Sequence, residues 1–109
     1  MKTIVHIDPG NCGLKTEAIV DTNNDQYFKF KILSDCKKVN KLAVRLRENG
    51  PFDAYTEIDP RSHSKILELS RQELKGCCEA CAVPISLFKS MQVAAGLAIP
   101  GDVTIHITN

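Results

Sequence analysis

The sequence predicts an α+β domain, a two-layer sandwich in which helices cover one face of a small, mainly antiparallel sheet. Three observations predict it. Apolar and polar residues alternate over three segments near the N-terminus, the apolar period then changes to that of helices over three segments, and one alternating segment closes the chain. The expected order is therefore strand, strand, strand, helix, helix, helix, strand, in one domain over residues 1–109.

The first three strands are expected at residues 3–8, 14–22 and 27–33. Pro9-Gly10 ends the first strand, and the sequence NNDQ supplies a hairpin turn after the second, because Asn and Asp tolerate left-handed backbone conformations. In the third strand, one face is apolar and the other polar, as in a sheet with one wet face. The apolar face carries Phe28, Phe30 and Ile32, and the polar face Tyr27, Lys29 and Lys31.

Three helices are expected within residues 34–51, 62–76 and 84–98. Ser34 or Asp35 is a suitable cap for the first, which Gly50-Pro51 ends; Gly76 closes the second, and Pro84 opens the third. The first helix has a clear apolar stripe, made of Val39, Leu42, Ala43 and Leu46. A last strand is expected over residues 102–108, with Val103, Ile105 and Ile107 on one face.

Composition excludes several functions. A net charge of +1 argues against nucleic acid as the main partner, because phosphate binding needs a concentrated basic face. The N-terminus lacks the apolar run of a signal peptide, and no segment approaches the roughly 20 apolar residues that span a membrane. We therefore expect a cytoplasmic protein with reduced thiols, and the odd number of cysteines, 5, argues against a complete disulfide framework.

The predicted path of the chain brings all the cysteines to one end of the fold. If the first strand runs up, the turn with Cys12 lies at the top, and the third strand delivers Cys36 to the same end. The first helix descends and the second returns upward, so the segment after it also reaches the top. That segment, GCCEACAVP, carries Cys77, Cys78 and Cys81. Loops and helix starts are positions where backbone N–H groups and the helix dipole stabilise a thiolate.

Thiolate is the form of cysteine that binds metals. Cys12, Cys36, Cys78 and Cys81 supply four ligands, enough for tetrahedral zinc or a small iron–sulfur cluster, with Cys77 as a spare or substitute. Composition does not separate zinc from iron. The pair Cys78 and Cys81, a C-x-x-C, can equally close a disulfide.

The cysteine pattern resembles the scaffold proteins on which iron–sulfur clusters are assembled, of the IscU or NifU N-terminal type. The matching segments are NCG at Cys12, FKILSDCKKVNKLAVRL at Cys36 and CCEACAVPISLFKSMQVAAGLA at Cys78 or Cys81. Leu14 stands where that family usually has aspartate, and Cys77 where it has histidine if Cys78 is the third cysteine. The chain is also similar to small proteins of anaerobic bacteria and archaea with a DPGxCG turn and a CxxC-x-VP segment.

We therefore expect a metal- or cluster-binding protein, a carrier or scaffold rather than an enzyme, whose partner is a cluster- or sulfur-transfer protein. One alternative is a thiol redox or sulfur-relay protein that uses Cys78 and Cys81 with Cys36 as nucleophile. Another is an interaction module with structural zinc. His6 and His106 lie in the first and last predicted strands, where a structural or solvent-facing role is favoured.

Overall fold

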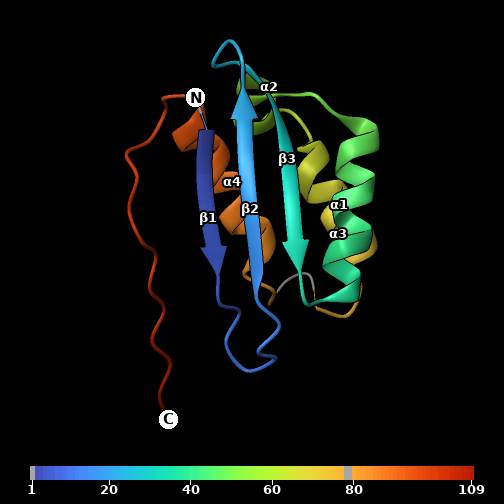
Figure 1. Ribbon diagram of the computed structural model, residues 1–109, viewed down its shortest axis with the longest axis vertical. Helices are drawn as coiled ribbons and strands as arrows, with labels where there is room; N and C mark the ends of the chain where they lie inside the picture. Colours follow the sequence, from blue (N-terminus) through green and yellow to red (C-terminus); the bar gives the residue numbers. More distant parts are fainter. Residues whose placement is uncertain (1, 78–79) are drawn as a thin grey trace.

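The residues described by the computed structural model, 2–77 and 80–109, form a four-stranded antiparallel sheet and four helices (Figure 1). This confirms the α+β class and the order of three strands followed by helices. The elements in chain order are β1 (Lys2–Ile7), β2 (Thr16–Thr22), β3 (Tyr27–Ser34), α1 (Lys37–Asn49), β4 (Phe52–Asp53), α2 (Ala54–Ile58), α3 (Lys65–Glu73) and α4 (Val83–Ala94).

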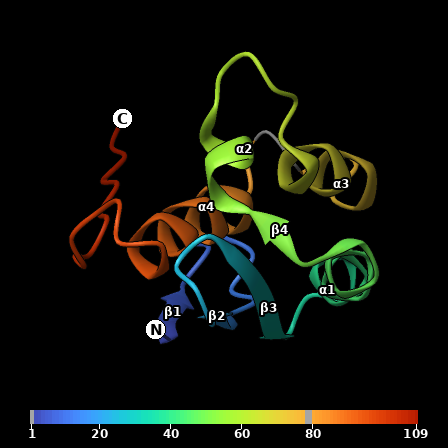
Figure 2. The ribbon, with the colours of Figure 1, turned by 90° about the horizontal axis from the view of Figure 1, so that it is seen from above.

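The strands lie in the order β1-β2-β3-β4, and each pairs antiparallel with its neighbour. The alternation predicted for β2 and β3 is present, with every second side chain buried on the same face. Figure 2 shows α4 over β1 and β2, with α1 at the β3 side of the sheet. The core lies between these layers; its largest fully buried side chains include Phe28, Leu42, Ile66, Leu87 and Met91.

Two short elements after α1 were not predicted. Phe52 and Asp53 form β4, which extends the sheet beyond β3, and Ala54–Ile58 form α2. The buried ring of Phe52 explains the first, because it packs near Phe28, with ring centroids 6.0 Å apart. Asp53 explains the second, because its carboxylate accepts a hydrogen bond from the Tyr55 backbone N–H and caps the helix. Two residues are too few to show a strand period in the sequence.

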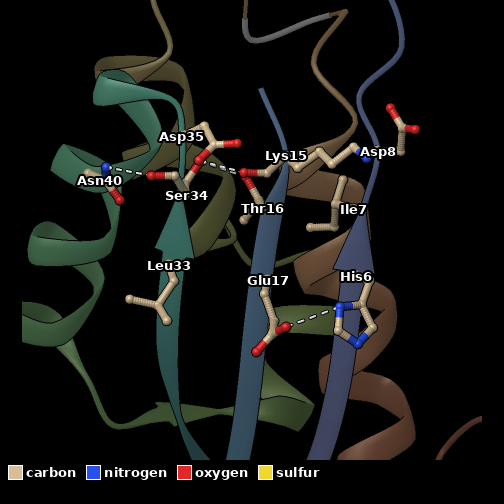
Figure 3. A pocket seen from close by; sticks show the side chains of 10 residues that line it. All are labelled: His6, Ile7, Asp8, Lys15, Thr16, Glu17, Leu33, Ser34, Asp35 and Asn40. Atoms are coloured by element: carbon tan, nitrogen blue, oxygen red, sulfur yellow. Dashed lines mark hydrogen bonds and ion pairs between the residues drawn. The ribbon is translucent and has the colours of Figure 1, made fainter. Parts of the chain in front are cut away.

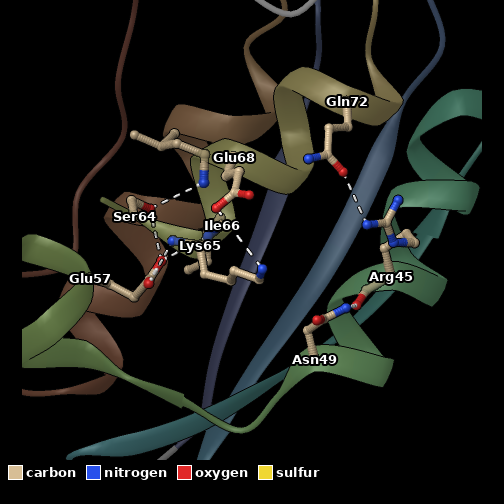
Figure 4. A network of polar contacts seen from close by, with 9 residues as sticks. Arg45, Asn49, Glu57, Ser64, Lys65, Ile66, Glu68 and Gln72 are labelled. Atoms are coloured by element: carbon tan, nitrogen blue, oxygen red, sulfur yellow. Dashed lines mark hydrogen bonds and ion pairs between the residues drawn. The ribbon is translucent and has the colours of Figure 1, made fainter. Parts of the chain in front are cut away.

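A buried carboxylate anchors the start of α3 (Figure 4). Glu57 is 6% exposed, and its oxygens accept hydrogen bonds from the Ser64 hydroxyl at 2.8 Å and from the backbone N–H groups of Lys65 and Ile66 at 2.9 Å each. Ser64 in turn caps Leu67 at 3.1 Å. The first turn of α3 is therefore fully provided with acceptors, which offsets the cost of burying the charge.

The third predicted helix is shorter than expected. α4 ends at Ala94 rather than near residue 98, because Gly96 adopts a left-handed conformation, with φ 74°, that closes the helix. Its backbone N–H donates to Val93 O at 3.0 Å, and that of Leu97 donates to Gln92 O at 2.8 Å. Within the described residues, no helix is both long and apolar enough to cross a membrane.

The prediction of a last strand over residues 102–108 is wrong. Residues 102–108 have no regular secondary structure and run away from the body of the molecule (Figure 1). The three apolar side chains expected on one strand face are exposed, Val103 by 61%, Ile105 by 75% and Ile107 by 86%. A strand needs a partner for its backbone groups, and this segment pairs with none of the described strands. β1 is consequently an edge strand.

A candidate thiol site at one end of the fold

Three segments that carry cysteines meet at one end of the molecule, which we call the cysteine end. They are the β1–β2 loop of residues 8–15, the β3–α1 junction of residues 34–37, and the chain between α3 and α4, described at residues 74–77 and 80–82 (Figure 1). Their described cysteines are free thiols: Cys12, Cys36, Cys77 and Cys81. Cys78, the other residue of the predicted ligand set, lies outside the described residues.

Cys12 lies in a tight turn. The Gly13 N–H donates to Gly10 O at 2.9 Å, and both glycines have positive φ values, 67° and 90°, that favour glycine over residues with a side chain. Asp8 supports the turn by accepting a hydrogen bond from the Gly10 N–H at 3.1 Å. The turn presents the exposed Cys12 thiol to solvent.

Hydrogen bonds fix the β1–β2 loop against the segment that carries Cys36. The Asp35 N–H donates to Lys15 O at 2.9 Å, and the Thr16 and Ser34 hydroxyls are hydrogen-bonded at 2.7 Å. Cys36 follows at the N-cap of α1, the position for which the sequence suggested Ser34 or Asp35. Its side chain is partly buried against the core, so two cysteine-bearing segments are held by the same end of the sheet.

Cys77 and Cys81 share one turn of chain. Cys77 O accepts backbone hydrogen bonds from Ala80 and Cys81, both at 2.8 Å, and these bonds hold the two cysteine residues close together. Cys77, predicted from the sequence to be a spare or substitute ligand, therefore lies close to the predicted ligand Cys81.

Lys38 lies beside this turn from α1. Its ammonium donates to Lys75 O at 2.9 Å and lies 4.0 Å from the Cys77 sulfur. The contact gives the exposed Cys77 thiol a positively charged neighbour. No sequence signal pointed to this contact, because the two residues are 39 positions apart.

The electrostatics of Cys81 link the four described thiols. Burial is the main cause that raises the pKa of the Cys81 thiol above its ordinary value of 9.0. The backbone N–H of Val83, a donor to the sulfur, opposes the increase, whereas the charges of Cys36, Cys12 and Cys77 add to it. Thiols from all three segments thus lie within electrostatic reach of one half-buried sulfur, and their like charges oppose one another.

The starts of two helices face the cysteine end without a side-chain cap. The N-cap residues of α1 and α4 are Cys36 and Ala82; neither makes a capping hydrogen bond, and neither helix has an acidic residue in its first turn. Helix N-termini carry partial positive charge and free N–H donors. This end of the fold is therefore suited to negatively charged groups such as thiolates.

The four sulfurs do not form a finished coordination shell. Within residues 2–77 and 80–109, no three His, Cys, Asp or Glu side chains form a group that could hold a metal ion as they stand. Like-charged thiolates approach one another closely only when a cation is present, and metal sites commonly form together with binding. The predicted ligands Cys12, Cys36, Cys77, Cys78 and Cys81 therefore stay a prediction.

A shallow cleft of about 710 Å³ lies beside the cysteine end, on the uncovered face of the sheet (Figure 3). Its lining includes Asp8, Lys15 and Asp35 from the cysteine-bearing segments, and the ion pair of His6 and Glu17, whose Nδ1 and Oε2 atoms are 3.2 Å apart. His106, predicted to lie in the last strand, belongs to the exposed C-terminal segment. The cleft therefore adjoins the segments that carry Cys12 and Cys36.

Comparison with known proteins places the chain in a family without assigning an activity. Residues 3–107 match the model of the Family of unknown function (DUF6951), and the chain belongs to that family. No curated protein and no solved structure matches it.

Proposed function

We propose that the protein binds a thiophilic metal ion or a small iron–sulfur cluster through its cysteine end, as a carrier or scaffold. The single observation that carries this proposal is the meeting of three separate cysteine-bearing segments at one end of the fold, where Cys12, Cys36 and Cys77 lie near enough to Cys81 to contribute to the raised pKa of its thiol. A cysteine that only fills space in the core does not need other thiols nearby. Four thiolate donors match tetrahedral zinc or a small cluster.

The surroundings of the thiols favour a site that exchanges its cargo. Cys12 and Cys77 are exposed, whereas Cys36 and Cys81 are half-buried, so one side of the site is open to solvent. Structural zinc sites are usually closed. The uncapped start of α1 supplies N–H donors that would stabilise the negative charge of a thiolate-bound cluster, and at the start of α4 the Val83 N–H already donates to the Cys81 sulfur.

The direct test is metal content after purification without air. We expect a stoichiometric amount of iron, with sulfide and visible absorption, or of zinc, and loss of most of it in Cys36→Ser and in Cys81→Ser. His63→Ala is the matched control, because it removes an exposed side chain that binds metals adventitiously but lies outside the cysteine end. Metal-free protein, before and after reconstitution with iron and sulfide or with zinc, contradicts the proposal.

A second candidate is a thiol redox or sulfur-relay protein, and Lys38 favours it. Its ammonium lies 4.0 Å from the sulfur of the exposed Cys77, and reactive cysteines typically lie in partly exposed, positively charged surroundings. In such a protein, two thiols lose two electrons and two protons to an oxidant and form a disulfide. Counting free thiols before and after mild oxidation separates the two functions: loss of two thiols within one chain supports the relay, whereas metal that protects all the thiols supports the carrier.

A further inference from the structure

The C-terminal segment has the pattern of a strand but no partner in its own chain. Val103, Ile105 and Ile107 alternate with polar residues, and all three are more than half exposed. Ile99, just before the segment, is 91% exposed. Single exposed aliphatic residues are ordinary, but four within nine positions make a continuous apolar surface that proteins usually cover. Since the family model extends over residues 3–107, the segment belongs to the family's common unit.

The sheet offers a matching unpaired strand. β1 lies at the end of the strand order, so one of its two edges is free over Lys2–Ile7. The edge carries no proline or bulge of the kind that blocks further pairing. Val5 on this strand is only partly buried although it packs against the core, and Ile4 on the other face is 60% exposed. An added strand would cover both.

The two strands agree in length and side-chain pattern. β1 has 6 residues, and the alternating segment spans 102–108. In a parallel register that starts at Lys2 and Asp102, opposite charges are neighbours. The same register sets Val103, Ile105 and Ile107 beside the helix-facing residues Thr3, Val5 and Ile7.

We infer that residues 102–108 of one copy of the chain add as a strand to the free β1 edge of a second copy. The tail already projects away from its own body through the exposed residues 96–101, as both ribbon views show. Each copy has one tail and one free edge, so a reciprocal exchange closes at two copies and leaves neither edge open. The occupant of the β1 edge is thus a second copy of this chain.

The test is the molar mass of the full chain in solution, by light scattering during gel filtration over a concentration series. We expect twice the chain mass of 12.0 kDa. Ile105→Asp removes a central contact of the added strand and should raise the dissociation constant of the dimer by about 10- to 100-fold. Ile99→Asp is the matched control: it places the same charge in the same tail but outside the strand, and should leave the dimer intact.

A second measurement identifies which chains are joined. Carbodiimide coupling of Lys2 to Asp102, in an equal mixture of ¹⁵N-labelled and unlabelled protein, should give mixed-isotope linked peptides. A monomer at every concentration, a dimer that Ile105→Asp leaves unchanged, or links found only within one chain would each overturn the inference. None of these variants changes a cysteine, so the result is independent of the proposed metal site.

Discussion

The two ends of the molecule differ in whether side chains cap the helices that start there. At the end opposite the cysteines, Asp53 caps α2, and Glu57 and Ser64 provide acceptors for the first turn of α3. At the cysteine end, α1 and α4 start at Cys36 and Ala82 without a side-chain cap. At the end opposite the cysteines, side chains at and near the helix starts accept hydrogen bonds from first-turn N–H groups and stabilise the fold. At the cysteine end, the N-cap residues make no such hydrogen bond.

This difference separates stability from function. A serine, threonine or aspartate at an N-cap contributes about 1 kcal/mol to folding, and nothing in the backbone of α1 prevents one at position 36. Residues that stabilise least where they stand are typical of functional sites, where activity is retained at the expense of stability. The comparison therefore supports a binding role for the cysteine end, and three variants and one change of pH test it.

The largest change in the free energy of unfolding is expected at the end opposite the cysteines, where the helix starts are capped. Glu57→Gln keeps the size of the side chain but replaces one acceptor oxygen by an amide donor that faces backbone N–H groups. We expect the free energy of unfolding to fall by about 2–3 kcal/mol, because a buried charged hydrogen bond is lost and a donor is left unpaired. Urea denaturation measures it. Glu68→Gln, which loses only an exposed ion pair with Lys65 at 4.0 Å, should change it by less than about 0.5 kcal/mol.

At the cysteine end, a substitution is expected to raise the free energy of unfolding. Cys36 has the extended backbone of a good N-cap, with φ −91° and ψ 123°. Cys36→Ser should therefore stabilise the metal-free protein by about 1 kcal/mol and, on the proposed function, lose most of the bound metal. The same denaturation experiment, paired with metal analysis, measures both. A destabilised Cys36→Ser protein would show that this cysteine serves packing rather than binding.

Ala82→Ser is the control for that gain. Ala82 is also an N-cap residue, but its backbone is helical, with φ −76° and ψ −12°. A serine there lacks the extended conformation from which its oxygen reaches the first-turn N–H groups. We expect a change in the free energy of unfolding of less than about 0.5 kcal/mol. An equal gain at both positions would mean that the two helix starts are alike.

The smallest effect is the response to alkaline pH. Burial raises the pKa of the Cys81 thiol, so the folded protein holds this proton more tightly than the unfolded chain does. The stabilisation is complete below the ordinary thiol pKa of 9.0 and is lost as the pH rises above it. Melting temperatures of the metal-free protein should fall above pH 9.0, and less so in Cys81→Ser. Bound metal should remove the difference, since it holds the thiolate form.

Local patterns predict most of the fold and only part of the site. β2, β3 and α1 follow from clear periods over seven or more residues. The predicted up-and-down path also leads the three cysteine-bearing segments to one end, as Figure 1 shows. The strand at 102–108 fails because alternation gives a segment's preference but does not supply a partner. The contact of Lys38 with Cys77 depends on how α1 packs beside the end of α3, which no local pattern contains.

The lack of side-chain caps on α1 and α4 also affects how a metal ion or cluster, bound as proposed, would be released. First turns without caps open at lower cost than the rest of a helix, because fewer of their hydrogen bonds are lost. The starts of α1 and α4 can therefore fray while the sheet and the Glu57 network stay folded. Handing over cargo would then need only a local loosening, detectable as faster amide exchange in those two turns.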